Sequence, residues 1–207
     1  SNLTTTKSGS NEFQFGANYM WEPDSFANDR PATYSSANQL DVRSRNEWNV
    51  WASGAILEDK LFFYGLYNPR SIKQSDASGA QQFNTERNDP FYGVKLDFIP
   101  FDGHRFEYTY FHDNQSAETE TLNMNNWPSF SLGDSASSRA SAIGAVTTDD
   151  IGGYVGTTIA QSGGENHIYK YTGILTDWFT ISAMYGTNEY NRTTGSTADG
   201  NPLVIDR

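Results

Sequence analysis

The stretch from Glu86 to Gln115 contains two runs in which apolar and polar side chains alternate, separated by a short turn. The first run is Tyr92–Phe98 and the second is Arg105–Tyr110. Alternation with a period of two is typical of a β-strand that has one apolar and one polar face. The stretch therefore predicts an antiparallel hairpin that turns near Phe101.

The order of charges within this hairpin predicts its register. Folding about Phe101 sets opposite charges across from one another on the polar face and apolar side chains across from one another on the other face. The four expected pairs are Asp97–Arg105, Lys95–Glu107, Leu96–Phe106 and Val94–Tyr108. Each such pair contributes about 0.2–1 kcal/mol. A β-bulge near Pro100, which has no N–H to donate to the ladder, would shift this register by one residue.

Five further segments have strand character, so that about seven strands are expected. They are Glu12–Trp21, Arg45–Ile56, Leu61–Tyr67, His167–Leu175 and Phe179–Tyr185. Three short turns (57–60, 99–103 and 176–178) alternate with three long polar segments (22–43, 69–85 and 116–165), which we expect to be loops, the last with a short strand near 149–159. In an up-and-down meander alternate connections lie at the same end. All short turns are therefore expected at one end of the sheet and all long loops at the other.

This asymmetry, together with the aromatic content, favours a membrane protein built from strands. Aromatic residues make up 14% of the chain although the mean hydropathy is –0.65, and no run of about 18 apolar residues could form a membrane-spanning helix. Short turns at one end, long loops at the other and aromatic rings near both strand ends are typical of transmembrane barrels. The fold class is predicted to be all-β, an antiparallel up-and-down transmembrane β-barrel whose apolar face contacts outer-membrane lipid. A soluble β-sandwich shows the same alternation and is the alternative.

Composition argues against several other functions. The net charge of –11 is spread along the chain, so we expect no nucleic-acid partner, which would require a basic stripe. None of the three histidines, His104, His112 and His167, has a nucleophile at a spacing typical of a catalytic motif, so we expect that the chain is not an enzyme. Neither Asp149–Asp150 nor the Glu118/Glu120 pair fits a calcium-loop spacing, so no metal or other cofactor is predicted.

Several motifs resemble TonB-dependent outer-membrane receptors. Thr6–Phe13 (TKSGSNEF) is similar to the segment where these receptors pass from the plug domain into the first barrel strand. Gly54–Gly65 resembles the first periplasmic hairpin of their Oar-like branch, and Trp21–Ser25 resembles the start of the first outer loop in that branch. The likeness is spread over most of Thr4–Asn191.

The resemblance implies a 22-stranded barrel, filled by an N-terminal plug, in the outer membrane of a Gram-negative bacterium. Extracellular loops would capture a large scarce nutrient, and the TonB complex would supply energy through the plug of the full-length receptor. About seven strands cannot close such a barrel, so the chain is expected to be its N-terminal part. Residues 1–11 would end the plug and its linker, 12–193 would form barrel strands and loops, and 194–207 would start a further extracellular loop. The alternative function is a soluble or surface-attached β-sandwich that binds carbohydrate or protein.

Two sets of residues are candidates for a functional site. The charge pairs Asp97–Arg105 and Lys95–Glu107 are expected to face the lumen and to hold the barrel wall or the plug in place. Aromatic side chains in a long polar loop often mark a binding surface, although they can equally pack the loop against itself. On this ground the predicted ligand contacts are Trp127, Phe130 and Tyr154.

Overall fold

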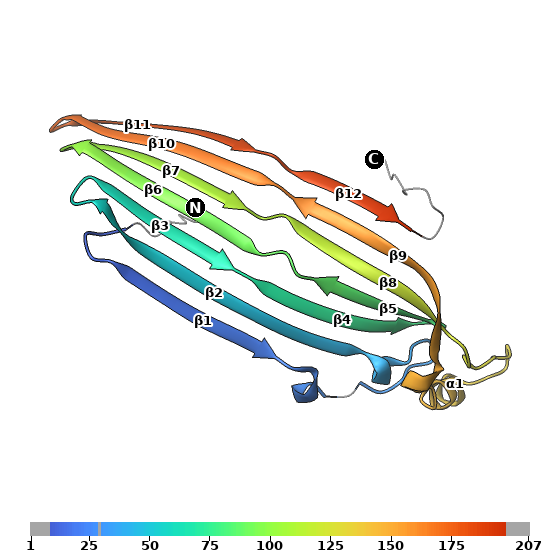
Figure 1. The fold of residues 1–207 in the computed structure, drawn as a ribbon. Helices are drawn as coiled ribbons and strands as arrows, with labels where there is room; N and C mark the ends of the chain where they lie inside the picture. The colour runs from blue at the N-terminus through green and yellow to red at the C-terminus, as the bar shows by residue number, and fades with distance from the viewer. Residues whose placement is uncertain (1–8, 29, 198–207) are drawn as a thin grey trace.

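The computed structural model describes residues 9–28 and 30–197, and these form one antiparallel β-sheet (Figure 1). Its strands are β1 (Gln14–Glu22), β2 (Val42–Leu57), β3 (Leu61–Asn68), β4 (Arg70–Ser78), β5 (Gln81–Arg87), β6 (Phe91–Phe101), β7 (His104–His112), β8 (Gln115–Met124), β9 (Ile151–Gly163), β10 (Glu165–Thr176), β11 (Phe179–Asn188) and β12 (Asn191–Ser196). The described helices are α1 (Ala136–Ile143) and the short 3-10 turns η1 (Asp24–Phe26), η2 (Asn38–Leu40) and η3 (Thr148–Asp150). The prediction of an all-β, antiparallel up-and-down fold is confirmed.

The twelve described strands are pieces of seven long ones. Residues 69, 88–90, 113–114, 164 and 189–190 interrupt five of the long strands; we call this row of interruptions the seam. The register does not change across it. Leu61 pairs with Phe98 in β3–β6 and Ile72 pairs with Arg87 in β4–β5, so that the paired residue numbers add up to 159 on both sides of the seam. The sheet is therefore a single meander with two free edges, β1 and β11–β12, and it is not closed.

The three predicted short turns lie together at one end of the sheet. The backbone N–H of Ile99 donates to the carbonyl of Lys60 at 2.7 Å, which joins the first two turns. The N–H of Ile174 donates to the carbonyl of Gly103 at 2.8 Å, which joins the second and third. The predicted sidedness of these turns is thus confirmed. We call the part of the sheet between these turns and the seam the turn-end half, and the part beyond the seam the loop-end half.

The loop-end half differs from the sequence-based prediction. Most of 69–85 is not loop, because β4 and β5 continue the sheet and are joined by a tight turn at Gly79, whose φ is +57°. Likewise the predicted loop 116–165 contains β8, the helix α1 and the whole of β9, which includes the short strand expected near 149–159. These strands carry polar side chains on both faces, so they lack the alternation from which strands are predicted.

The predicted register of the β6–β7 hairpin is wrong by two residues. Asp97 lies opposite Glu107, not Arg105, and Leu96 lies opposite Tyr108. The register is irregular between Phe98 and Phe101, the stretch that contains Pro100. The expected ion pairs form nevertheless, because diagonal neighbours in a sheet lie within reach of long side chains.

A small apolar core lies at the far end of the loop-end half. Its buried members are Ala37, Leu40, Ala77, Met124, Ile143 and Val146. The side-chain amide of Gln39 donates to the carbonyls of Ile143 and Val146 at 3.0 and 3.1 Å, which ties the connection 23–41 to the connection 125–150. The sequence did not predict α1, because Ile143 is its one buried residue and an amphipathic pattern is absent. None of the described helices has the length and apolar character needed to cross a membrane.

Candidate functional site

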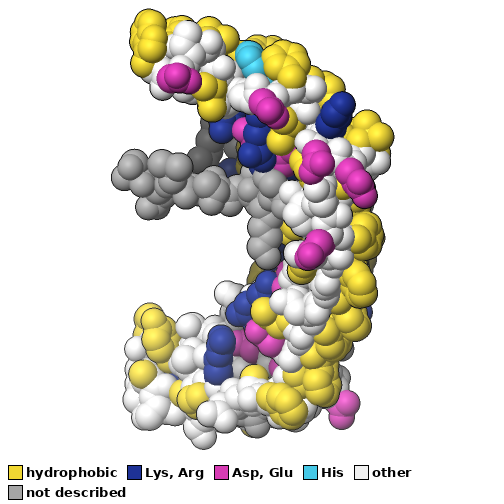
Figure 2. All heavy atoms as spheres, turned by 90° about the vertical axis from the view of Figure 1, so that its left-hand side faces the viewer, with side chains coloured by type: hydrophobic (Ala, Val, Ile, Leu, Met, Phe, Trp, Pro, Cys, Tyr) yellow, Lys and Arg dark blue, Asp and Glu magenta, His cyan; other side chains and the backbone are white. Residues whose placement is uncertain are grey.

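The sheet is curved, and its two faces differ in chemistry. Figure 2 shows hydrophobic side chains along most of the convex side and acidic and basic side chains within the concavity. In the turn-end half many large apolar side chains are exposed on the convex face. They include Phe15, Tyr19, Trp48, Val50, Val94, Phe98, Phe106, Tyr169 and Ile181. The predicted outward set of β7 belongs with them, since Tyr108 lies opposite Leu96 and Phe106 opposite Phe98.

Aromatic rings border this convex face at both of its ends. Trp178, which is 85% exposed, and Phe101 lie at the short turns. At the seam the rings of Tyr19 and Trp48 stack with their centroids 4.5 Å apart, and Trp21 packs near Phe26. The convex face of the turn-end half thus carries an exposed apolar band between two rows of rings.

The charged residues of the predicted pairs come together on the concave face. Asp97 is only 1% exposed, and its Oδ1 accepts a hydrogen bond from Arg105 Nη2 at 2.8 Å and lies 3.6 Å from Lys95 Nζ. The carboxylate of Glu107 lies 2.9 Å from Lys95 Nζ and 3.1 Å from Lys170 Nζ. These five residues form what we call the concave charge cluster. It contains three cations and two anions.

The strand β10, which contributes Lys170 to the concave charge cluster, explains the observed register of β6 and β7. Two carboxylates directly opposite one another repel. Here Asp97 and Glu107 are flanked by the diagonal cations Lys95 and Arg105, and Lys170 of β10 lies directly across from Glu107. Sequence reasoning missed Lys170. Its place on the polar side of the predicted strand His167–Leu175 was the available signal, but the pairing of β10 with β7 was needed to use it.

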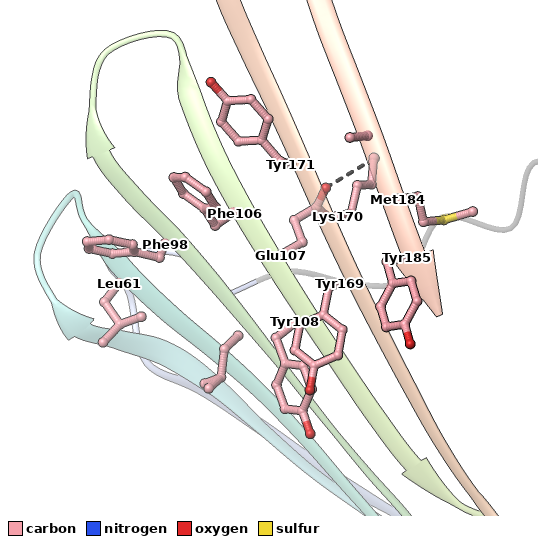
Figure 3. A pocket seen from close by; sticks show the side chains of 12 residues that line it. Leu61, Phe98, Phe106, Glu107, Tyr108, Tyr169, Lys170, Tyr171, Met184 and Tyr185 are labelled. Carbon is pink, nitrogen blue, oxygen red and sulfur yellow. Dashed lines mark ion pairs between the residues drawn. The ribbon is translucent and has the colours of Figure 1, made fainter. Parts of the chain in front are cut away.

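A groove of about 480 Å³ runs along the turn-end half beside this cluster (Figure 3). Its lining residues are Leu61, Leu96, Phe98, Phe106, Glu107, Tyr108, Tyr169, Lys170, Tyr171, Ala183, Met184 and Tyr185. Figure 3 shows the Glu107–Lys170 ion pair and Met184 on one side of the strands and the rings of Tyr108, Tyr169 and Tyr185 on the other. Apart from this ion pair, the lining consists of apolar and aromatic side chains, four of them tyrosines.

Each of the three histidines contacts a tyrosine. Nδ1 of His104, at the short turns, is 2.7 Å from the Tyr171 hydroxyl. Near the seam, Nδ1 of His167 is 2.9 Å from the Tyr108 hydroxyl, and the ring of His112 stacks on Tyr92 at 4.7 Å. In these contacts the histidines meet phenol groups and rings, as expected of residues that border an apolar band.

The structure places the three predicted ligand contacts in two environments. Trp127 and Phe130 are partly buried against the apolar core, and the guanidinium of Arg139 lies 4.5 Å from the centre of the Phe130 ring. Tyr154 is 59% exposed on β9, with its hydroxyl 2.9 Å from Thr157 Oγ1. The first two rings thus pack the connection 125–150, and only Tyr154 has most of its surface accessible.

Among the carboxylates that were considered for metal binding, Asp150 has structural partners. Asp150 accepts hydrogen bonds from the Thr147 N–H at 2.8 Å and from Asn126 Nδ2 at 2.6 Å. The Thr147 amide, with Asn126, holds the pKa of Asp150 below its ordinary value. Glu118 lies directly opposite Glu86, whose pKa is lowered by the hydrogen bond from Lys73. Across the residues that the structure describes, no three His, Asp or Glu side chains are grouped so that they could hold a metal ion.

Comparisons with known proteins give no match. No family model matches the chain, and neither do any of the curated proteins or solved structures with which it was compared.

Proposed function

We propose that this chain forms the N-terminal part of the barrel wall of a TonB-dependent receptor in the outer membrane of a Gram-negative bacterium. The observation that carries the proposal is the inverted burial of the turn-end half. Asp97 and Lys95 are 1% and 5% exposed on the concave face, whereas large rings such as Phe106 are exposed on the convex face. A chain folded for water buries its rings and exposes its charges.

The dimensions of the turn-end half suit a bilayer. A strand that crosses the hydrocarbon core at a tilt needs about 9–11 residues. The strands β6, β7, β10 and β11 have 11, 9, 12 and 10 residues. Lipid would cover their convex face, and the rows of rings would lie at the two membrane surfaces.

The free edges support a barrel larger than the described sheet. Unpaired backbone groups at a strand edge cost several kcal/mol each in lipid, so the edges of β1 and β11 require partners there. Both of these strands begin at the short turns, hence they run in the same direction. Direct closure would pair them in parallel. An all-antiparallel barrel therefore needs an odd number of additional strands between them.

The alternative of a β-sandwich receives less support. A sandwich requires two sheets packed face to face. All described strands belong to one sheet, and no second sheet lies against either face within residues 9–28 and 30–197. The convex rings would then have no partner layer.

The transport mechanism rests on the resemblance of the sequence motifs to the receptor family. Extracellular loops at the loop end would capture a large scarce nutrient, and the plug of the full-length receptor would rearrange when the TonB complex pulls on it. The nutrient would then pass along the concave wall. No chemical step is assigned to the chain.

Two measurements on the full-length parent protein in its native cells test the proposal. After cell fractionation, a high-salt wash should leave the protein in the outer-membrane fraction, whereas a peripheral protein would be released. Nutrient uptake that is lost when the parent gene is deleted should be lost equally when the gene for TonB is deleted. Release by salt would contradict the membrane location, and uptake that persists without TonB would contradict the energy source.

A further inference from the structure

We propose that the concave face binds a multivalent anion, with two or more carboxylate or phosphate groups, through three arginines at the seam. These are Arg45 of β2, Arg70 of β4 and Arg87 of β5, and we call them the arginine cluster. The inference rests on the proposed function insofar as it names the chemical class of the transported nutrient.

The arginine cluster is arranged around Ile72. The residue lies directly opposite Arg45 on one side and directly opposite Arg87 on the other. Arg70 precedes it by two positions on the same strand and lies opposite Glu47. Directly opposed residues have Cβ atoms about 4.5–5.5 Å apart, and positions two apart on one strand lie about 7 Å apart on the same face. The three arginines therefore occupy positions that neighbour the same apolar residue, Ile72.

Strand parity places the arginine cluster on the concave face. Ser53 of β2 lies opposite Tyr64, which lies opposite Lys95 of the concave charge cluster. Arg45 is eight positions from Ser53, and the pairing of β1 with β2 runs through this stretch without a bulge. The residues of the arginine cluster thus share the face of Lys95. On the convex side of the same strands, the hydroxyl of Tyr19 donates to Asn46, the neighbour of Arg45, at 2.8 Å.

Carboxylates offset part of the positive charge of the arginine cluster, since Glu22 lies directly opposite Arg45 and Glu47 lies directly opposite Arg70. Nε of Arg45 donates to the Glu47 carboxylate at 2.7 Å, but Nε of Arg70 donates to the backbone carbonyl of Asp89 at 2.9 Å. The Asp89 carboxylate in turn accepts the N–H of Ser116. Within the described part of the chain, neither Arg70 nor Arg87 forms an ion pair with a carboxylate.

The three arginines exceed these two carboxylates by one positive charge, whereas the net charge of the whole chain is –11. Like charges close together repel, so the three arginines cost folding energy unless an anion offsets it. The guanidinium fork matches carboxylate and phosphate groups in a bidentate manner. A local excess of positive charge on a concave wall also raises the concentration of anions near it. These properties favour a multivalent anion over a neutral saccharide or a cation.

The absence of cysteine from the sequence allows the potential at the arginine cluster to be measured directly. In the full-length parent protein, purified in detergent, the variant Ile72→Cys is reacted with an anionic sulfonatoethyl and with a cationic trimethylammonioethyl methanethiosulfonate. The parent protein without the introduced thiol is the blank. Ser71→Cys is the matched control, because Ser71 lies opposite Asn46 on the convex face. A difference in potential of about 1 kT between the two positions corresponds to a ratio of anionic to cationic rates about tenfold higher at position 72 than at position 71.

Two charge variants connect this ratio to the arginines. The double substitution Arg45→Gln/Arg87→Gln is combined with Ile72→Cys. It should lower the ratio of anionic to cationic rates at position 72 to nearly the ratio measured with Ser71→Cys. Lys73→Gln, which removes a cation from the convex face of the same strand, should leave it unchanged. Equal ratios at positions 71 and 72, or a ratio that the double variant does not alter, would overturn the proposal.

Protection by probe anions tests binding. Citrate and pyrophosphate should each slow the reaction of the anionic reagent with the thiol at position 72 in a saturable manner, and sucrose should not. Whichever of the two anions slows the reaction at the lower concentration shows whether the site prefers carboxylate or phosphate groups. Protection that survives in the double variant would contradict binding through these arginines. This assay needs neither a membrane nor TonB, so it tests anion binding independently of the proposed transport. If the anions protect the thiol but a salt wash releases the protein from the membrane, the anion site stands and the proposed transport function is contradicted.

Discussion

The two halves of the sheet use the same seven strands but bury opposite kinds of side chain. In the turn-end half the least exposed side chains are polar or charged, among them Asp97 and Lys95, and many of the rings are exposed. In the loop-end half the buried side chains include an apolar group around Ile143, and the strands are polar on both faces. The register runs through the seam without change. Backbone pairing is thus common to both halves, and the difference between them lies in the side chains.

The comparison indicates where each half obtains its stability. If lipid surrounds the turn-end half, burial of rings provides no driving force between strands, and ion pairs on the concave face gain importance. If water lies on both sides of the loop-end half, that half depends on its small apolar core and on backbone hydrogen bonds. Each prediction below changes a residue in one half and compares it with a matched residue.

The largest effect is expected for Asp97→Asn in the concave charge cluster. The substitution removes the less exposed of the two carboxylates that Lys95 and Arg105 both contact, and leaves Glu107 as the other. Removal of one partner from a buried ion pair costs about 3–5 kcal/mol. In the loop-end half, Glu86→Gln breaks an exposed pair with Lys73 and should cost at most about 1 kcal/mol. Urea unfolding of the parent protein in detergent measures both, and equal costs would show that the cluster is not a buried network.

The second largest effect is expected for a charge introduced on the convex face, whose cost in folding free energy should differ between the two halves. Tyr108→Lys places a cation in the middle of the apolar band and should cost about 2–4 kcal/mol in lipid. Asn84→Lys is the control, because Asn84 lies opposite Glu120 in the loop-end half and the new charge meets an acid. Its cost should stay within about 0.5 kcal/mol. Folding into lipid vesicles measures both values. Equal tolerance at the two positions would contradict a lipid-facing turn-end half.

A smaller and more local effect is expected for Ile143→Val in the apolar core of the loop-end half. Loss of one methylene from a fully buried site costs about 0.5–1.5 kcal/mol. Hydrogen exchange of the α1 amides should therefore accelerate, while the amides of β6 and β7 keep their protection. Leu132→Ala, at an exposed position of the same connection, should change neither. Faster exchange throughout the sheet would show that the two halves unfold as one unit.

The same comparison explains what could be predicted from the sequence. Several strands of the turn-end half alternate between apolar side chains on the convex face and polar side chains on the concave face, and β1, β6 and β11 were found in this way. In the loop-end half both faces are polar, so β4 and β5 resembled loop. The arginine cluster was missed for the same reason, because Arg70 lay in a predicted loop and Arg87 lay outside every predicted strand.

The register error has a different cause. Pairwise charge matching considered only β6 and β7, whereas the actual arrangement satisfies three strands at once. Lys170 supports Glu107 from β10, which makes the direct opposition of Asp97 and Glu107 tolerable. Two-strand reasoning correctly named the residues in contact, Asp97 with Arg105 and Lys95 with Glu107, but could not choose between direct and diagonal contact.

The smallest effect concerns acid sensitivity of the loop-end half through Asp150. Its pKa is lowered chiefly by the hydrogen bond from the Thr147 N–H, so the capped turn is stabilised at pH values above the ordinary aspartate range. As the pH falls through the lowered pKa, the carboxylate is protonated and this stabilisation is lost. Exchange of the amides at 147–151, corrected for its intrinsic pH dependence, should therefore accelerate only below the ordinary aspartate pKa of 3.8. Asp150→Asn should show the faster exchange at neutral pH, whereas Asp149→Asn should not, because the Asp149 side chain forms no hydrogen bond with the described residues. A transition near neutral pH, or one that both variants share, would mean that the cap on η3 does not control this turn.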